Sequence, residues 1–213
     1  MSNNWKNTEK ERRIVHSTIQ RIERIHPFKT ALYLSMAASG AIWLFILGGY
    51  AFTLSANAEV TLAMPKAFIV STLMLLVSSY SLSGLVQAFQ HDDPKSMVKK
   101  LGVTLVLAVL FAISQFIGWL QLSDTGFYNS AIGDSPYFYI LSAFHLLHVL
   151  VGLAAMVYAF IFTLFHTADP VKNLILITNP FQKLKLELLV SYWHYLNATW
   201  VVLFLYFLFI ALP

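Results

Sequence analysis

Long apolar runs dominate the chain, and prolines and charged residues separate them. Five of these runs are long enough to cross a bilayer as helices, because about 20 apolar residues span the hydrocarbon core. They cover about 30–54, 67–90, 101–121, 136–165 and 185–212. None of them alternates polar and apolar residues, as a membrane-spanning strand of about ten residues would. The pattern therefore predicts an all-α integral membrane protein, with a bundle of five transmembrane helices within residues 29–213.

The residues before the first run are polar. Within residues 1–28, Thr8 and Glu11 have the spacing of a capping box, and apolar residues follow at helical intervals as far as Pro27. We expect a short amphipathic helix over 8–26 that lies on the cytoplasmic side.

Composition and charge place the chain in a membrane and orient it. The chain is 58% hydrophobic and 11% charged, whereas soluble domains carry about 25% charged residues. Five crossings place the N-terminus and the loops 91–100 and 166–186 on one side, and 13 of the 14 Lys and Arg residues lie there. The positive-inside rule then predicts a cytoplasmic N-terminus and an outer C-terminus. The net charge of +4 fits this topology and contact with anionic lipid, and it does not indicate a nucleic-acid partner.

Polar residues inside the last two predicted helices are the candidate functional residues. Polar groups at membrane depth commonly form hydrogen bonds between helices, and we expect His194 to bond across to the fourth helix. A metal or haem site is the alternative, because two histidines three residues apart share one helix face. Against it, Glu187 lies about 10 Å from His194 along the helix axis. The candidates are His145, His148, Glu187, Ser191, Trp193, His194, Asn197 and Trp200.

Polar residues also interrupt the second and third predicted helices. The hydroxyl groups of Ser78 and Ser79 can return a hydrogen bond to a carbonyl one turn earlier, so a structural role is expected. Gln115 cannot satisfy both of its amide hydrogens in that way. We expect Gln115 to contact a neighbouring helix.

Two motifs in the last two helices give the chain a family resemblance. The first is Phe-His-x-x-His-Val-x-x-Gly over 144–152, and the second is Glu-x4-Tyr-Trp-His over 187–194, followed by Trp200. In this order and spacing they resemble subunit III of the haem-copper terminal oxidases. Members of that family have seven helices or five, and this chain is similar to the five-helix form.

The resemblance implies a subunit that has no catalytic site and binds no haem or copper itself. Its expected partners are oxidase subunits I and II, with subunit IV as a further one, and bound phospholipid. The complex would reduce O2 to water and pump protons in a bacterial cytoplasmic membrane. An aa3-type cytochrome c oxidase is the favoured interpretation and a quinol oxidase the alternative, so the electron donor is cytochrome c or a quinol. A self-standing b-type haem electron carrier and a small transporter are the alternatives from other classes.

The chain departs from the family pattern at several motif positions. Thr72 stands where the family often has an intramembrane glutamate, and Gly118 replaces the acid of the Gln-x-x-Glu motif that begins at Gln115. Asn197 replaces the usual aspartate, and Leu146 replaces the glycine between the histidines. With these acids absent, a proton relay through this subunit is not indicated. A role in packing and in holding lipid is unaffected.

Overall fold

The computed structural model describes residues 27–56, 66–124 and 135–211. These residues form helices joined by short turns, and no strand occurs among them. Five of the helical segments are long and apolar enough to cross a membrane. The structure therefore confirms the predicted all-α membrane protein with five candidate spans. The helix predicted over 8–26 lies outside the described residues.

The spanning helices begin one to seven residues before the predicted starts. Four of the helices in the described residues start at a proline, where the missing amide hydrogen costs least because the first turn of a helix has no internal partner for it. The elements are α2 Pro27–Ala56, α3 Lys66–Ser83, α4 Leu85–Gln90, α5 Pro94–Asp124, α6 Ser135–Thr167, α7 Pro170–Thr178 and α8 Pro180–Ala211.

The chain divides into two compact units between Ser39 and Gly40, within α2. In the first unit the described residues are the first half of α2, where the Ser35 hydroxyl donates to the carbonyl of Leu32 at 2.8 Å. The second unit contains the rest of α2 and the helices α3 to α8. All residues of the candidate site belong to this second unit.

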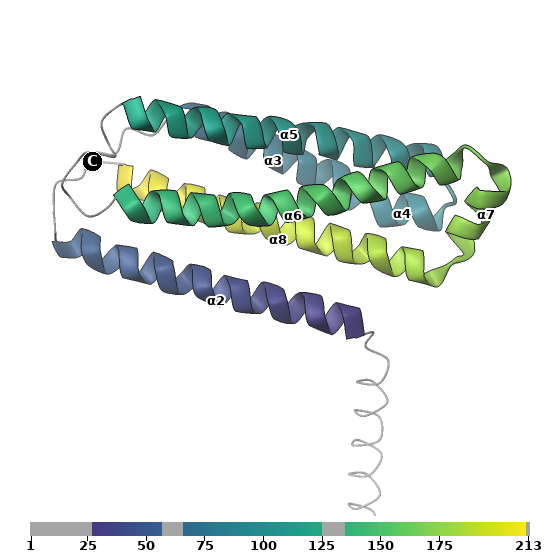
Figure 1. Cartoon of the computed structure of the whole chain (residues 1–213), viewed down its shortest axis with the longest axis horizontal. Helices are drawn as coiled ribbons and strands as arrows, with labels where there is room; N and C mark the ends of the chain where they lie inside the picture. The colour runs from purple at the N-terminus through teal and green to yellow at the C-terminus, as the bar shows by residue number, and fades with distance from the viewer. Residues whose placement is uncertain (1–26, 57–65, 125–134, 212–213) are drawn as a thin grey trace, which may run out of the picture. The chain divides into compact units, whose positions relative to one another are not determined.

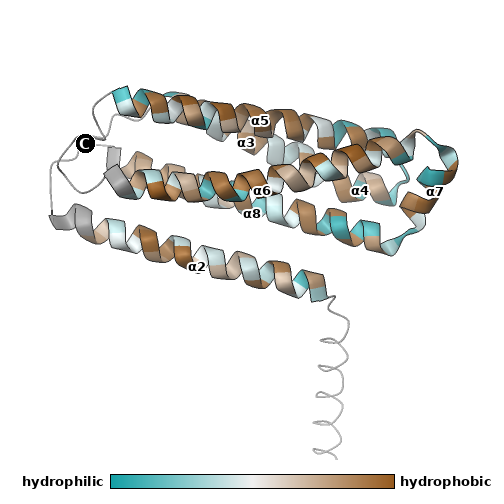
Figure 2. Cartoon of the chain, in the orientation of Figure 1, coloured by the Kyte–Doolittle hydropathy of each residue, from teal (hydrophilic) through white to brown (hydrophobic). Residues whose placement is uncertain are grey.

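Four spanning helices of the second unit form a bundle (Figure 1). The helix α3 lies beside α5 and α8, and α6 lies beside the same two helices. Large side chains such as Phe68, Phe111 and Trp193 are buried among them. Figure 2 shows hydrophobic residues along the middle of α5 and α6, and hydrophilic residues gathered at the end that carries α7. That distribution is typical of helices that cross a bilayer.

The sequence predicted one continuous helix over 67–90, but the second span is not continuous. It is interrupted at Gly84, between α3 and α4. A side chain at this position would meet Lys100, whose Nζ lies 2.6 Å from the place of a Cβ atom. The close approach of Lys100 is therefore possible because residue 84 is a glycine. Beyond the interruption, α4 packs against α5 and α8 and buries Leu85 and Phe89.

The predicted loop over 166–186 contains a helix that sequence reasoning missed. This helix, α7, begins behind Asp169, whose carboxylate accepts a hydrogen bond from the backbone N–H of Val171 at 2.9 Å. Pro170 occupies the first helical position. An acidic N-cap followed by proline is a start signal for a helix. It was present in the sequence, but a segment of nine residues is too short to show a clear apolar period.

Candidate functional site: hydrogen bonds between the helices

Two tryptophans of α8 bind hydroxyl groups of α3. The indole Nε1 of Trp193 donates to Oγ of Ser78 at 3.2 Å, and Nε1 of Trp200 donates to Oγ1 of Thr72 at 3.0 Å. All four side chains are buried. Two hydrogen bonds about two helical turns apart thus fix both the register and the rotation of α8 against α3.

The hydroxyl groups can accept these bonds because their own hydrogens are used within α3. Ser78 donates to the carbonyl of Leu75, and Thr72 donates to the carbonyl of Phe68, both at 2.7 Å. An indole is a donor only, whereas a hydroxyl has one hydrogen and two lone pairs. Each hydroxyl therefore donates along its own helix and accepts from the neighbouring helix, so no charge is needed at this depth.

The imidazole of His194 also contacts α3. Its Nδ1 lies 2.7 Å from Oγ of Ser79. The sequence analysis expected a partner on the fourth predicted helix, which is α6, and this expectation was wrong. The contact shows that His194, which follows Trp193 in the chain, also lies on the side of α8 that faces α3. His194 therefore does form a contact between helices, but with Ser79 of α3.

The helix α6 is hydrogen-bonded to α8 through the backbone carbonyl of His148. The imidazole Nδ1 of His148 lies 2.8 Å from the carbonyl of Phe144 in its own helix. The backbone carbonyl of His148 accepts a hydrogen bond from the hydroxyl of Tyr192 at 3.2 Å. The hydrogen bond between the two helices therefore joins the Tyr192 side chain to the backbone of His148, and the imidazole ring of His148 takes no part in it.

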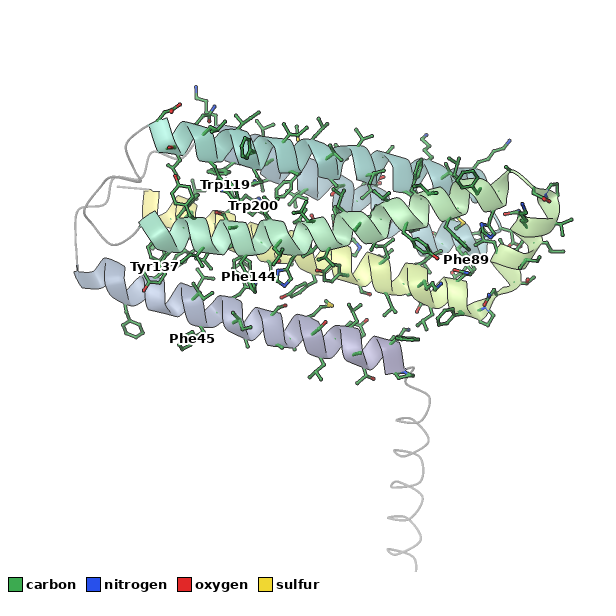
Figure 3. All side chains as sticks on the ribbon, viewed as in Figure 1. Phe45, Phe89, Trp119, Tyr137, Phe144 and Trp200 are labelled. Carbon is green, nitrogen blue, oxygen red and sulfur yellow. The ribbon has the colours of Figure 1, made fainter. Side chains whose placement is uncertain are left out.

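Further side-chain hydrogen bonds connect α5 to α3 and to α6. Nε2 of Gln115 donates to Oγ of Ser71 in α3 at 2.9 Å, as the sequence predicted for this residue. Nε1 of Trp119 donates to Oγ of Ser142 in α6 at 3.1 Å. Figure 3 shows Trp119 and Trp200 between the helices of the bundle. Side-chain hydrogen bonds thus connect α3 to α8, α8 to α6, α6 to α5 and α5 to α3.

His145 lies in an aromatic environment at the centre of this bundle. Its ring is 1% exposed and contacts the rings of Trp200, Phe111 and Trp43, with centroids 5.2, 6.0 and 6.0 Å away. Among the residues described by the structure, Nε2 of His145 has no hydrogen-bond partner. Its packing therefore rests on ring contacts, which prefer tilted and edge-to-face geometries such as these.

Asn197 is buried one turn before Trp200. Its amide Nδ2 donates to the carbonyl of Trp193 in the same helix at 2.9 Å. Its Oδ1 has no partner within the described ranges. The amide hydrogen bond of Asn197 therefore stays within α8, in contrast to the indole bonds next to it.

The glycine that ends the first motif, Gly152, lies where α6 and α8 approach each other closely. A Cβ atom on Gly152 would lie 2.9 Å from Cδ1 of Leu196 and 3.3 Å from Cε1 of Tyr192. Small residues at helix contacts in membranes allow backbones to approach closely. The motif glycine is thus explained by packing, and the same approach places the Tyr192 hydroxyl near the carbonyl of His148.

Glu187 and Ser191 lie in the N-terminal half of α8. The carboxylate of Glu187 is 3.9 Å from Nζ of Lys183, one turn earlier, and both side chains are partly exposed. Ser191 is partly buried. In the described part of the chain, no three His, Asp or Glu side chains come together in a way that could hold a metal ion. No such group is therefore formed by the residues that could nominally supply metal ligands, His145, His148, Glu187 and His194.

Sequence reasoning missed several hydrogen-bond partners of this site. It did not identify Ser71, Thr72 and Ser142 as acceptors. It named Tyr192 as part of a motif but not as a donor. One signal was available, because a buried indole must find an acceptor. In the described structure, three of the five tryptophans donate to a hydroxyl group, namely Trp119, Trp193 and Trp200.

The fold and the site define a polytopic helical membrane protein whose buried polar side chains hold the helices together. Comparison with known proteins gives the family. The model of the family described as Cytochrome c oxidase subunit III matches residues 57–211. The chain therefore belongs to the cytochrome c oxidase subunit III family.

Curated relatives carry both kinds of oxidase name. The chain is 25% identical to the probable cytochrome c oxidase subunit 3 of Nocardia farcinica, over 85% of this chain and 90% of that protein. It is 26% identical to cytochrome c oxidase subunit 3 of Synechocystis, over 81% of this chain and 71% of that protein. It is 28% identical to the cytochrome bo(3) ubiquinol oxidase subunit 3 of Buchnera aphidicola, over 64% of this chain and 65% of that protein. The match to cytochrome c oxidase subunit 3 of Loxodonta africana is 26% identical, and this chain spans 48% of the length of that protein.

Proposed function

We propose that this chain is the non-catalytic subunit III of a bacterial aa3-type cytochrome c oxidase, where it stabilises subunit I and holds phospholipid. The observation that carries the proposal is the family match over residues 57–211. The site supports it, because its buried polar groups are used between helices, which suits a subunit that supports others. Haem and copper belong to the partner subunits in this proposal, and the complex lies in the cytoplasmic membrane.

The second candidate function is subunit III of a quinol oxidase. The relative from Buchnera aphidicola carries the name of a ubiquinol oxidase subunit and is 28% identical over 140 residues. We place it second, because the Nocardia farcinica relative covers more of this chain and almost all of its own length. In both candidates the partners are subunits I and II, with subunit IV as a further partner.

The test is to purify the tagged chain from its native membranes in mild detergent. The proposal expects haem-containing subunit I to copurify, with O2 reduction driven by reduced cytochrome c. Reduction driven by a quinol instead would support the second candidate. Absence of any haem protein from the purified fraction would contradict both candidates, and haem that stays with the separated chain would support the b-type carrier.

The role of His194 is tested in the same complex. His194→Ala removes the contact with Ser79, which spans 2.7 Å. The haem and copper content per subunit I should stay unchanged, because the imidazole binds a serine of its own chain. Retention of this subunit or of its phospholipid in detergent should decrease. Loss of a haem or a copper together with the imidazole would show that His194 serves a cofactor.

A further inference from the structure

The helix α7 exposes its apolar side chains. Val171, Leu174 and Ile175 are 68%, 60% and 60% exposed. They are spaced by three and four residues, so they form one stripe along the helix. A surface helix of a protein in water turns such a stripe inward, because burial of apolar area is favourable.

The opposite face of α7 carries a buried polar group. Oδ1 of Asn173 is inaccessible and has no hydrogen-bond partner among the described residues, and Leu176 is 3% exposed beside it. An amide placed inward and three aliphatic side chains placed outward would be an unfavourable arrangement in water. The arrangement becomes favourable if the surroundings of the outer face are apolar.

Lysines flank this stripe at the same end of the bundle. Lys172 lies on α7 itself, 3.9 Å from the carboxylate of its N-cap Asp169. In the first turns of α8, Lys185 lies over the ring of Phe181, with Nζ 4.9 Å from the ring centroid. Figure 1 shows α7 in the connection between α6 and α8, where both spans end. The described residues at this end, 90–100 and 166–187, contain six lysines and four acidic residues.

The exposed apolar surface of α6 continues toward α7. Ile161, Leu164 and Phe165 in the last turns of α6 are 45%, 45% and 69% exposed. The exposed stripe of α7 follows after a turn of two residues. Apolar exposure next to cationic side chains at the end of a span is the pattern of a helix that lies in the boundary between headgroups and acyl chains.

We propose that α7 is an interfacial helix that binds the anionic phospholipid surface at its end of the bundle. Val171, Leu174 and Ile175 enter the acyl boundary, and Lys172 and Lys185 contact phosphate groups. This inference goes beyond the proposed function and does not depend on it, because it concerns the bilayer and needs no oxidase partner.

The chain has no cysteine, so a single nitroxide label reports one position. The label is placed by Leu174→Cys in the full chain, reconstituted in vesicles of phosphatidylcholine and phosphatidylglycerol at about 7:3. Val106→Cys in the middle of α5, where the side chain is 58% exposed, is the bilayer reference. Lys95→Cys at the exposed start of α5 is the aqueous reference. The measurement is the collision rate of each label with O2 and with a water-soluble nickel chelate.

The proposal expects the label at Leu174 to resemble Val106, with several-fold more collisions with O2 than the aqueous reference and few with nickel. A label that resembles Lys95 would overturn it, because α7 would then face water. A label shielded from both reagents would also overturn it, since protein would cover the stripe. Deletion of residues 2–26 would then show whether this chain's own N-terminal segment is the cover.

The charge component is tested separately. In vesicles of phosphatidylcholine alone, the Leu174 label should lie closer to water, with a higher nickel collision rate than in the mixed vesicles. The double variant Lys172→Gln/Lys185→Gln should remove this difference between the two lipids. If the Leu174 label has the same nickel collision rate in both lipids while Lys172 and Lys185 are still present, the assignment of an anionic surface is overturned.

Discussion

Gly118 of α5 lies against the ring of Phe68 in α3, and this contact limits how close the two helices come. A Cβ atom on Gly118 would lie 2.6 Å from Cε1 and 2.8 Å from Cζ of that ring. Phe68 is 1% exposed and contacts the rings of Phe138 and Trp200, with centroids 5.7 and 6.1 Å away. The ring therefore has little room to move. Overpacking of this kind costs about 1–3 kcal/mol, and we expect this cost for Gly118→Ala.

Gly102→Ala is the matched control, since it lies in the same helix. A Cβ atom there would lie 3.2 Å from Cε2 of Phe160, a ring that is only partly buried and needs to shift by a few tenths of an ångström. Both substitutions gain helix propensity of about 1 kcal/mol, so this gain cancels in the comparison. Gly118→Ala should be less stable than Gly102→Ala by about 1–3 kcal/mol, or about 2–12 °C in Tm.

The assay is thermal unfolding of the purified protein in mild detergent, measured as the fraction that still elutes as a monodisperse peak after heating. A second substitution separates the steric cause from others. Phe68→Leu removes the atoms nearest to the new methyl group, so it should recover most of the difference in the Gly118→Ala background. Equal Tm values for the two alanine variants, or no recovery with Phe68→Leu, would refute the reasoning.

Three further outcomes follow from the site and the charge pattern. His194→Ala and Ser79→Ala should be non-additive in a double-mutant cycle, with a coupling of about 0.6–1.7 kcal/mol; additive losses would mean that the 2.7 Å contact contributes nothing. Ser78→Ala should lower Tm more than Ser83→Ala, since both hydroxyls donate within α3 but only that of Ser78 accepts an indole in the described structure; equal losses would show that the indole bond is not needed. Reporter fusions at the C-terminus and in the turn between α4 and α5 should report opposite compartments, and the same compartment for both would contradict five crossings.

The spanning helices were predictable because apolar length is a property of each segment by itself. The contact of Gln115 with a neighbouring helix was predictable for a similar reason, since its amide cannot be satisfied within one helix. The partner of His194 was not predictable from spacing. A rise of about 1.5 Å per residue puts His194 at a depth similar to that of His148 in α6, which is why a partner on that helix was expected. The rotation of α8 about its axis instead points His194 to Ser79 of α3. Rotation depends on all the side chains of a helix at once.

Local interruptions were harder to predict than whole spans. The break at Gly84 lies where the side chain of Lys100 in α5 comes close to the backbone, and no local pattern connects these two residues. The helix α7 had its signal in Asp169 and Pro170, but its apolar residues face outward, so the usual expectation of an inward stripe did not apply. Both features depend on surroundings that the sequence of the segment does not contain.

The hydroxyl groups of this bundle explain how helices with few charges choose their neighbours. Apolar contacts between helices give little preference for one face, because lipid tails are as apolar as leucine. A hydroxyl that has already donated to its own helix offers only lone pairs, so it selects a donor such as the indole of Trp193, Trp200 or Trp119. Removal of the indole leaves the hydroxyl bonded, whereas removal of the hydroxyl leaves a buried donor without a partner, which costs about 1–3 kcal/mol. The specificity of the helix order therefore rests more on the serine and threonine positions than on the aromatic residues that the family motifs emphasise.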